Sequence, residues 1–281
     1  MQSIHPDLHI PENTAMALYI VIWQFTKENV KGSLLPCYNS SEGQPLDRII
    51  IRFVNRIFHF GDNDMDRKIH ATEYGICFWS METFTGFLKK EKIRSKKLLA
   101  LFQKDDKLFL KLVENGIWIP LPQVDSVDYC IKIKNLSEEY DNQWEKVLEY
   151  GGFNIEIVDG LWISGLGSFF KFDRTLYQGE GHEYIDNFGM KNFDSNKERW
   201  HITLNDYKIY HDVHVDIPSG KYLLTVKGYS RKEPKDISTD KEAVNFGYQL
   251  ELVKVDTFNG YKNPREDEFE FNIGKIIRTR N

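Results

Sequence analysis

After His70 the chain consists largely of short apolar stretches separated by glycine, proline, asparagine and aspartate. Alternation of apolar and polar residues is the pattern of a half-buried β-strand, and the separating residues are typical of turns. Many short strands with regular turns are typical of antiparallel β-sandwiches, so the pattern predicts a mainly β protein. The predicted strands are 73–80, 107–113, 116–120, 127–134, 153–158, 161–166, 201–204, 207–215, 221–229, 246–255 and 268–273.

Two of these stretches nearly repeat each other. Aligned on Trp118 and Trp162, LVENGIWIPL and EIVDGLWISGL share an acidic or amide residue, a glycine, an aliphatic residue, Trp and Ile. Asn-Gly and Asp-Gly between apolar alternations favour the type I′ turns of β-hairpins. We therefore expect hairpins at 115–116 and 159–160, one in each of two related β modules.

The Gly165-Leu-Gly167 segment invites comparison with a phosphate-binding loop. Such a loop leads from a strand into a helix, whose N-terminal amides hold the anion. The residues that follow here, 168–172, have the composition of a strand instead. The glycines therefore do not predict a phosphate site.

The expected organisation has three parts. Residues 1–70 are predicted to be a helical N-terminal segment, because apolar residues recur at helical spacing in 11–31 and 46–58. Residues 71–143 are predicted to form a first β module with a basic helix at 84–102, and residues 144–281 a second β-sandwich module. Whether the two modules stack as one sandwich or form separate domains is left open by the sequence.

Composition restricts the classes of partner and compartment. The 281 residues are 41% hydrophobic, enough for a sizeable core, and the net charge of −5 does not predict binding to nucleic acid or anionic membranes. Cys37, Cys77 and Cys130 lie far apart and form no CxxC pair, which favours reduced thiols in a cytoplasmic protein. The apolar run near the N-terminus is shorter than the ~20 residues that a membrane span needs.

One segment resembles a calcium-binding loop. Asp62, Asp64, Asp66 and Glu73 occupy the first, third, fifth and twelfth positions of such a loop, but Arg67 stands where the sharp turn requires glycine. Because that requirement is steric, we interpret the segment as a solvated acidic turn.

The remaining candidates for chemistry are also weak. His211 and His214 would point to opposite faces of one strand, which argues against joint metal coordination, with His182 and His201 elsewhere in the same module. Ser164 and Ser168 lie in no Gly-x-Ser-x-Gly context, and no cysteine lies in a catalytic motif. We therefore expect no enzymatic activity, no metal and no cofactor.

The stretches 144–166, 207–229 and 246–256 together resemble bacterial immunity-type proteins. The nearest families are the competence protein J-type nuclease inhibitors and related β-sandwich proteins encoded beside secreted toxins. The shared pattern is a strand, an Asp-Gly turn and a second strand, then Pro218, Gly220 and Tyr222 in a turn, and a final Tyr-x-Leu-x-Leu strand starting at Tyr248. The resemblance implies a β-sandwich that neutralises a cognate toxin by binding, with no catalytic residues of its own.

The distribution of charge suggests where such a partner would bind. Residues 85–111 are rich in lysine, whereas 123–160 are rich in acids. The acidic stretch could simply be a solvated face, or it could meet a basic nuclease-type toxin by charge complementarity. The candidate partner-binding residues are Glu138, Glu139, Tyr140, Asp141, Trp144 and Glu145.

The first hypothesis is therefore a cytoplasmic immunity protein that binds and neutralises a cognate toxin. The alternative is a β-sandwich module that binds a small molecule or a carbohydrate, with some of the 14 tyrosines and 6 tryptophans stacking on the ligand. An aromatic-lined groove with converging polar groups would favour this alternative. A third option, a hydrolase, would require a Ser or Cys within reach of a histidine that a third group orients.

Overall fold

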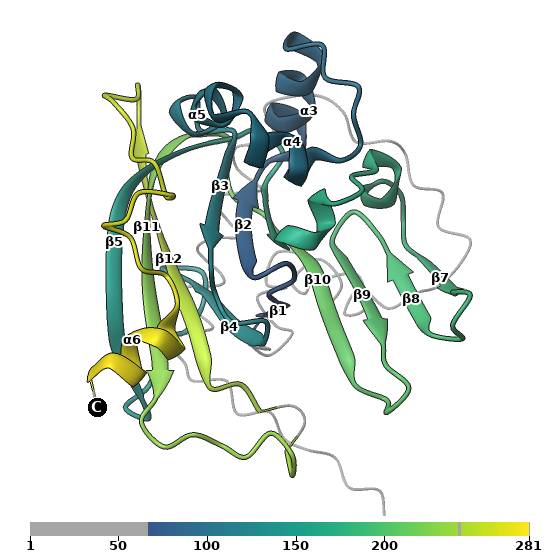
Figure 1. Cartoon of the computed structure of the whole chain (residues 1–281), viewed down its shortest axis with the longest axis vertical. Helices are drawn as coiled ribbons and strands as arrows, with labels where there is room; N and C mark the ends of the chain where they lie inside the picture. Colours follow the sequence, from purple (N-terminus) through teal and green to yellow (C-terminus); the bar gives the residue numbers. More distant parts are fainter. Residues whose placement is uncertain (1–66, 241–242, 281) are drawn as a thin grey trace, which may run out of the picture. The chain divides into compact units, whose positions relative to one another are not determined.

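The computed structural model describes residues 67–240 and 243–280, all within the second of the two units into which the chain divides, Gly61–Asn281. The predicted helices at 11–31 and 46–58 and the first part of the acidic loop, residues 62–66, lie outside the described residues. The described part is mainly β, as the alternation predicted, and contains two sheets with a shared core (Figure 1).

The first sheet has five strands. In spatial order they are β1 (Arg67–His70), β4 (Asp128–Ile133), β12 (Phe246–Val255), β11 (Gly220–Arg231) and β5 (Trp144–Ile157). All neighbours are antiparallel except β4 and β12, which run parallel. The long strands β5, β11 and β12 form one continuous curved surface (Figure 1).

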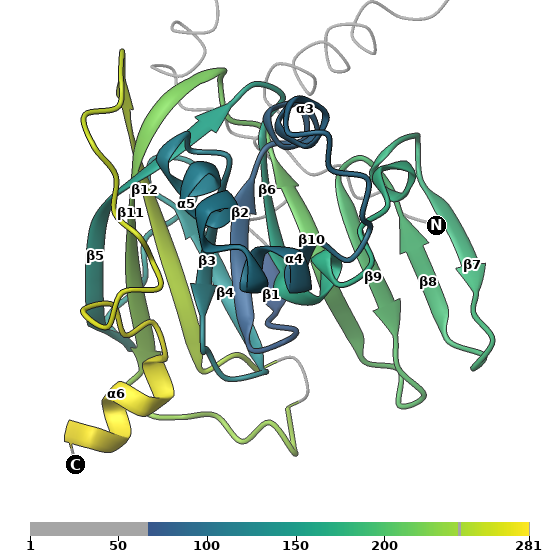
Figure 2. The same cartoon turned by 45° about the horizontal axis from the view of Figure 1, so that its top comes forward.

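The second sheet has seven strands. In spatial order they are β3 (Trp118–Pro122), β2 (Gly75–Trp79), β6 (Leu161–Gly165), β10 (Lys208–Val215), β9 (Glu198–Ile202), β8 (Lys191–Asp194) and β7 (His182–Ile185). Strands β7 to β9 continue the sheet away from the first sheet (Figure 2).

Helices cover the ends of both sheets. Near β2 and β3 lie α3 (Met81–Lys90), α4 (Leu98–Lys104) and α5 (Asp106–Glu114), whereas α6 (Ile273–Arg280) lies beside β5 and β11 (Figures 1 and 2). Two 3₁₀ helices follow β6: η1 (Leu166–Phe169) and η2 (Arg174–Tyr177). The predicted basic helix is thus two helices, and the segments at 168–172 and 268–273 are not strands.

The predicted hairpin at Asn115-Gly116 is wrong. The chain before it is helix α5, whose N-terminus is capped by Asp105, where Oδ1 accepts a hydrogen bond from Leu108 N at 3.0 Å. A type I′ turn needs positive φ at both central residues, but φ is −85° at Asn115 and +67° at Gly116. Gly116 instead ends the helix in a Schellman motif, with Ile117 N donating to Leu112 O at 2.8 Å.

The second predicted hairpin, at Asp159-Gly160, is also wrong. The strands on either side do not pair, because β5 belongs to the first sheet and β6 to the second. The chain passes from one sheet to the other at Asp159 and Gly160. The Asp159 carboxylate accepts a hydrogen bond from the Ser80 hydroxyl at 2.5 Å, which holds this segment in position. Gly160 has a φ of +89°, a backbone conformation that favours glycine.

The Trp repeat nevertheless has a structural meaning. Strand β2 lies between β3 and β6, and Trp79 pairs with Trp118 on one side and with Trp162 on the other. Directly opposed residues of antiparallel strands share a face, so the three indoles form a row across the sheet. Phenylalanines from α3, α4, α5 and η1 pack on this row and make an aromatic core.

The predicted modules 71–143 and 144–281 share both sheets. Strand β4 of the first range pairs with β12 of the second, and β2 pairs with β6. A single core of buried apolar residues includes both ranges. The strands of the two ranges are therefore interleaved within both sheets.

Candidate functional site

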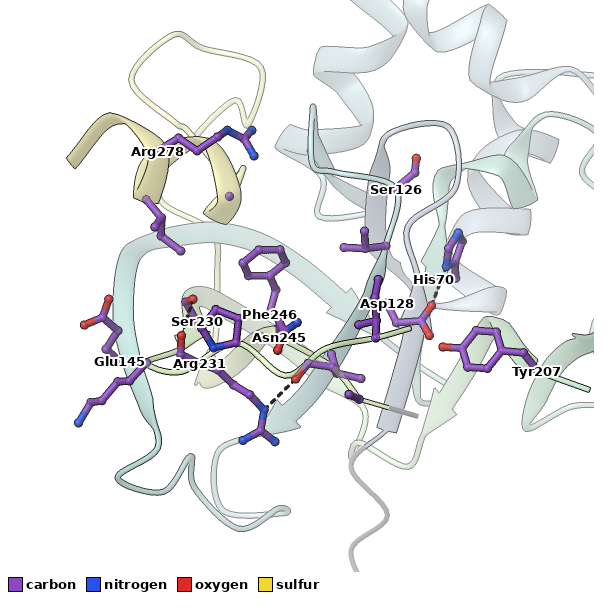
Figure 3. A pocket seen from close by; sticks show the side chains of 18 of the residues that line it. His70, Ser126, Asp128, Glu145, Tyr207, Ser230, Arg231, Asn245, Phe246 and Arg278 are labelled. Carbon is purple, nitrogen blue, oxygen red and sulfur yellow. Dashed lines mark hydrogen bonds and ion pairs between the residues drawn. The ribbon is translucent and has the colours of Figure 1, made fainter. Parts of the chain in front are cut away.

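A pocket of about 990 Å³ opens at one end of the first sheet (Figure 3). Its wall combines the end of β1, the start of β4, the start of β5, the β9–β10 turn, the connection from β11 to β12, and α6. Apolar residues of its wall include Val127, Phe246 and Ile277, and polar and charged side chains lie among them.

One end of the pocket holds a histidine–aspartate pair. His70 and Asp128 are opposed in the β1–β4 register, which places both side chains on one face, and His70 Nδ1 lies 2.6 Å from Asp128 Oδ1. The two side chains are 25% and 10% exposed. The hydroxyl of Tyr207, from the β9–β10 turn, is directed toward this pair (Figure 3).

One of the two ring nitrogens of His70, Nε2, is not used in the contact with Asp128. With Nδ1 on Asp128, no residue of the described ranges hydrogen-bonds Nε2. The pair therefore resembles the base-and-orienter half of a hydrolytic triad. Ser126 also lines the pocket, but within the described residues no Ser or Cys forms a hydrogen bond with His70.

The opposite end of the pocket is built around Arg231, the last residue of β11. Its Nε donates to Val244 O at 2.9 Å and its Nη1 to Gln143 Oε1 at 3.2 Å. The guanidinium carbon lies 4.5 Å from the centre of the Trp144 ring, its partner across the β5–β11 pair. Arg231 thus ties the start of β5 to the β11–β12 connection.

The β11–β12 connection is braced from within. Asn245 Oδ1 accepts a hydrogen bond from Lys235 N at 2.8 Å, and Asn245 Nδ2 donates to Lys235 O at 2.9 Å. These two hydrogen bonds join two segments of the loop in the way that paired backbone groups join two β-strands. This part of the pocket wall therefore has a defined position.

Helix α6 forms another wall and is anchored at its first turn. Asn272 caps the helix by accepting from Lys275 N at 2.8 Å, while its Nδ2 donates to Gln123 O at 2.9 Å and Asp125 Oδ1 at 3.0 Å. A Cβ at Gly274 would lie 2.6 Å from Asp125 Oδ2, so a larger residue there would displace the Asp125 side chain. The anchoring places Ile277 and Arg278 at the pocket.

The predicted partner-binding residues lie between β4 and β5 and at the start of β5. Glu138, Glu139, Asp141 and Glu145 are exposed, whereas Tyr140 and Trp144 are half-buried. The Tyr140 hydroxyl donates to Cys130 O at 2.8 Å, and its ring lies 4.3 Å from Tyr229 and 4.8 Å from Trp144. The two aromatic rings are thus packed on the sheet, and Glu145 alone of the six lines the pocket.

The surface beside them is not uniformly acidic. Lys134 and Lys227 both bind Glu251, at 2.7 and 2.9 Å, and Lys146 pairs with Glu149. The exposed face of β5, β11 and β12 therefore carries alternating charges. A flat acidic face, which would favour toxin binding, is not what these strands present.

A separate polar cluster is buried under the second sheet. Asp212, fully buried, accepts hydrogen bonds from Arg199 Nη1 at 3.0 Å, Ser168 Oγ at 3.1 Å and the Tyr177 hydroxyl at 3.2 Å. Burial raises the pKa of Asp212, and the nearby Arg199 opposes this; burial likewise raises the pKa of Tyr177. Both oxygens of the carboxylate accept hydrogen bonds, so the cluster holds β9, β10, η1 and η2 together.

The histidines of β9 and β10 make a further pair. His201 Nδ1 lies 2.6 Å from His211 Nε2, while His214 Nε2 instead bonds Asp159 O at 2.8 Å. His211 and His214 thus have different neighbours, as their spacing predicted. His182 lies exposed on the edge strand β7. Within 67–240 and 243–280, no three His, Cys, Asp or Glu side chains are arranged to hold a metal ion.

The sequence did not single out the pocket. Its polar residues come from segments far apart in the chain, and none belongs to a motif; His70 and Asp128 are adjacent only because β1 pairs with β4.

The described helices include none that is long and apolar enough to span a membrane.

No family model, curated protein or solved structure matches this chain. The function must therefore be inferred from the geometry of the described residues.

Proposed function

We propose that this protein binds a small molecule in the pocket between β1, β4, α6 and the β11–β12 connection, without catalysing a reaction. The observation that supports this proposal is the pocket itself: about 990 Å³ in volume and lined by apolar residues together with a few polar and charged ones. Small-molecule sites commonly have 300–1,000 Å³, apolar walls and a few polar groups that orient the ligand.

The rigidity of the walls supports the same proposal. Binding costs less when the site is already ordered. Here Asn245 braces the connection, Asn272 anchors α6, and Asp128 orients the His70 ring.

A pocket-filling variant tests the proposal. Ile277 lines the pocket from α6 and is half-buried, so Ile277→Trp is expected to occupy part of the space and abolish ligand binding. Thr279→Trp, at an exposed position of the same helix outside the pocket, is the matched control and should leave binding unchanged. A metabolite library is screened by thermal shift, and hits are measured by calorimetry. Equal affinity of the two variants for every hit would contradict the proposal.

A second candidate is the immunity function. Its support is the exposure of Glu138, Glu139, Asp141 and Glu145 in one short segment beside the half-buried Trp144. Buried aromatic anchors with a polar rim are typical of protein interfaces. In this proposal the protein acts in the cytoplasm, which the free, buried thiol of Cys77 supports, and neutralises a cognate toxin by covering it.

Co-purification distinguishes the second candidate. The tagged protein is recovered from lysate of its source organism at low and high salt, and stoichiometric partners are identified by mass spectrometry. Glu138→Lys with Glu139→Lys should release a toxin partner, whereas Asp267→Lys with Glu268→Lys, equally exposed acids elsewhere, should not. Retention of the partner by both double variants would exclude this acidic segment as the contact.

A further inference from the structure

Strand β7 (His182–Ile185) ends the seven-stranded sheet, and its outer edge pairs with no strand of the described residues. It is the outermost strand in Figure 2, and each of its residues is exposed. Ile185 is 74% exposed, and Phe188, in the turn to β8, is 81% exposed. Edge strands are usually protected from pairing with another chain by lysine, proline or a bulge. Strand β7 contains neither lysine nor proline, and its register with β8 is regular.

The backbone groups that face outward follow from the pairing with β8. Asp186 N donates to Met190 O at 3.0 Å, so the backbone of Asp186 faces that side of the hairpin. Backbone groups alternate in direction along a strand, so those of Tyr184 also face β8. The N–H and C=O groups of Glu183 and Ile185 therefore point away from β8, where no described strand pairs with them.

This alternation restricts how two copies of β7 can pair in the antiparallel sense. Outward groups must meet outward groups, so Glu183 opposes either Glu183 or Ile185 of the second copy, or Ile185 opposes itself. Opposed glutamates would repel each other. Opposed isoleucines would need Asn187 to continue the strand, but the chain turns there, with Gly189 N donating to Asp186 O at 3.0 Å. The remaining register, Glu183 opposite Ile185, uses only residues of β7 for its hydrogen bonds.

The remaining register is also complementary in its side chains. With Glu183 opposite Ile185, Tyr184 meets Tyr184 of the second copy on the two-fold axis, and His182 lies opposite Asp186. Cross-strand aromatic pairs stabilise antiparallel strands, as do pairs of opposite charge. An imidazole N–H that donates to a carboxylate adds a charge-assisted hydrogen bond at each end of the contact.

We propose that β7 is a dimerisation edge, to which a second copy of this chain adds its own β7 in the antiparallel sense. Backbone hydrogen bonds join Glu183 of each copy to Ile185 of the other, and the two seven-stranded sheets become one. Addition of a strand to an exposed edge is a recurring mode of recognition, in which backbone hydrogen bonds supply the affinity. The contact is small, so the dimer should be reversible and should form as the protein concentration rises.

The test is sedimentation velocity of the full-length protein over a range of concentrations. The wild type should shift from monomer toward dimer as the concentration rises. Ile185→Pro removes an outward N–H and leaves the hydrogen bonds to β8 in place, so dimerisation should be lost. Ile185→Ala keeps this N–H and is the matched control, with a dissociation constant that should rise by less than about fivefold.

Charge variants of His182 test the register independently. His182→Asp places a second carboxylate opposite Asp186 and should weaken the dimer about tenfold, because like charges then repel at both ends of the contact. His182→Lys gives an ion pair at the same positions and should leave the dimer at least as stable as that of the wild type. Thermal unfolding of each variant in dilute solution checks that the monomer is folded.

Hydrogen exchange distinguishes a second copy from another occupant of the edge. The amides of Glu183 and Ile185 should exchange rapidly in dilute protein and become protected at the concentrations at which the dimer forms. Protection that does not depend on concentration would mean that the same chain covers the edge, and would overturn the proposal. A monomer at every concentration, or a dimer that neither Ile185→Pro nor His182→Asp weakens, would also overturn it.

Discussion

Acidification should destabilise this protein through the histidine pair of β9 and β10. Burial, then the neighbouring His201, Arg199 and His70, lower the pKa of His211 from 6.5 to about 3. His201, 2.6 Å away, also has a lowered pKa, mainly from burial. Arg199 is cationic, and His201 and His70 become cationic when they are protonated. These neighbours therefore disfavour the protonated form of His211.

The sign and size of the effect follow from linkage. Between pH 6.5 and about 3 the unfolded chain binds a proton at His211 that the folded chain excludes. The stabilisation is therefore complete above pH 6.5 and is lost as the pH falls. Each pKa unit corresponds to about 1.4 kcal/mol, so unfolding should become easier by about 2 kcal/mol at pH 5 relative to pH 7.

The assay is urea unfolding at pH 7 and pH 5, followed by tryptophan fluorescence, for three proteins. The wild type should lose about 2 kcal/mol more than His211→Gln between the two pH values, because glutamine cannot be protonated. His182→Gln removes an exposed histidine and should behave as wild type. The reasoning is refuted if wild type and His211→Gln lose the same free energy of unfolding on acidification.

Two further substitutions test the fold. Asp212→Asn should lower the free energy of unfolding by about 2 kcal/mol, measured in urea, because it removes one of the two carboxylates, Asp212 and Asp194, that pair with the largely buried guanidinium of Arg199; a loss below 1 kcal/mol would contradict this. Gly116→Ala should destabilise by about 2 kcal/mol, because φ is +67° and the new Cβ would lie 3.0 Å from Ile155 Cα. Its control, Gly86→Ala in the open middle of α3, should stabilise by about 0.5–1 kcal/mol in the same thermal or urea assay.

Several strands could be predicted from the sequence. Strand β12 (Phe246–Val255) coincides with its prediction, and β10 and β11 differ from theirs by a few residues. In β11 buried and half-buried residues alternate along most of the strand, which is the pattern that periodicity detects. The edge strand β7 and its neighbour β8 were missed because β7 lies fully exposed and β8 has no fully buried residue.

The helix α5 shows why the same method failed. In DKLFLKLVENG the apolar residues are dense enough to fit a strand or one face of a helix, and Asn-Gly suits both a hairpin turn and a helix C-terminus. The deciding features were the Asp105 cap and the packing of Phe109 and Leu112 into the core. Tertiary packing of this kind has no signature in a local pattern.

The pocket has a topological origin that no motif could indicate. Strands β11 and β12 are antiparallel neighbours, which a two-residue turn could join, yet their connection runs from Lys232 to Asn245. Long connections in compact domains are often functional, because a short turn would fold the sheet equally well. Here the connection is braced by Arg231 and Asn245 and supplies the wall opposite His70 and Asp128.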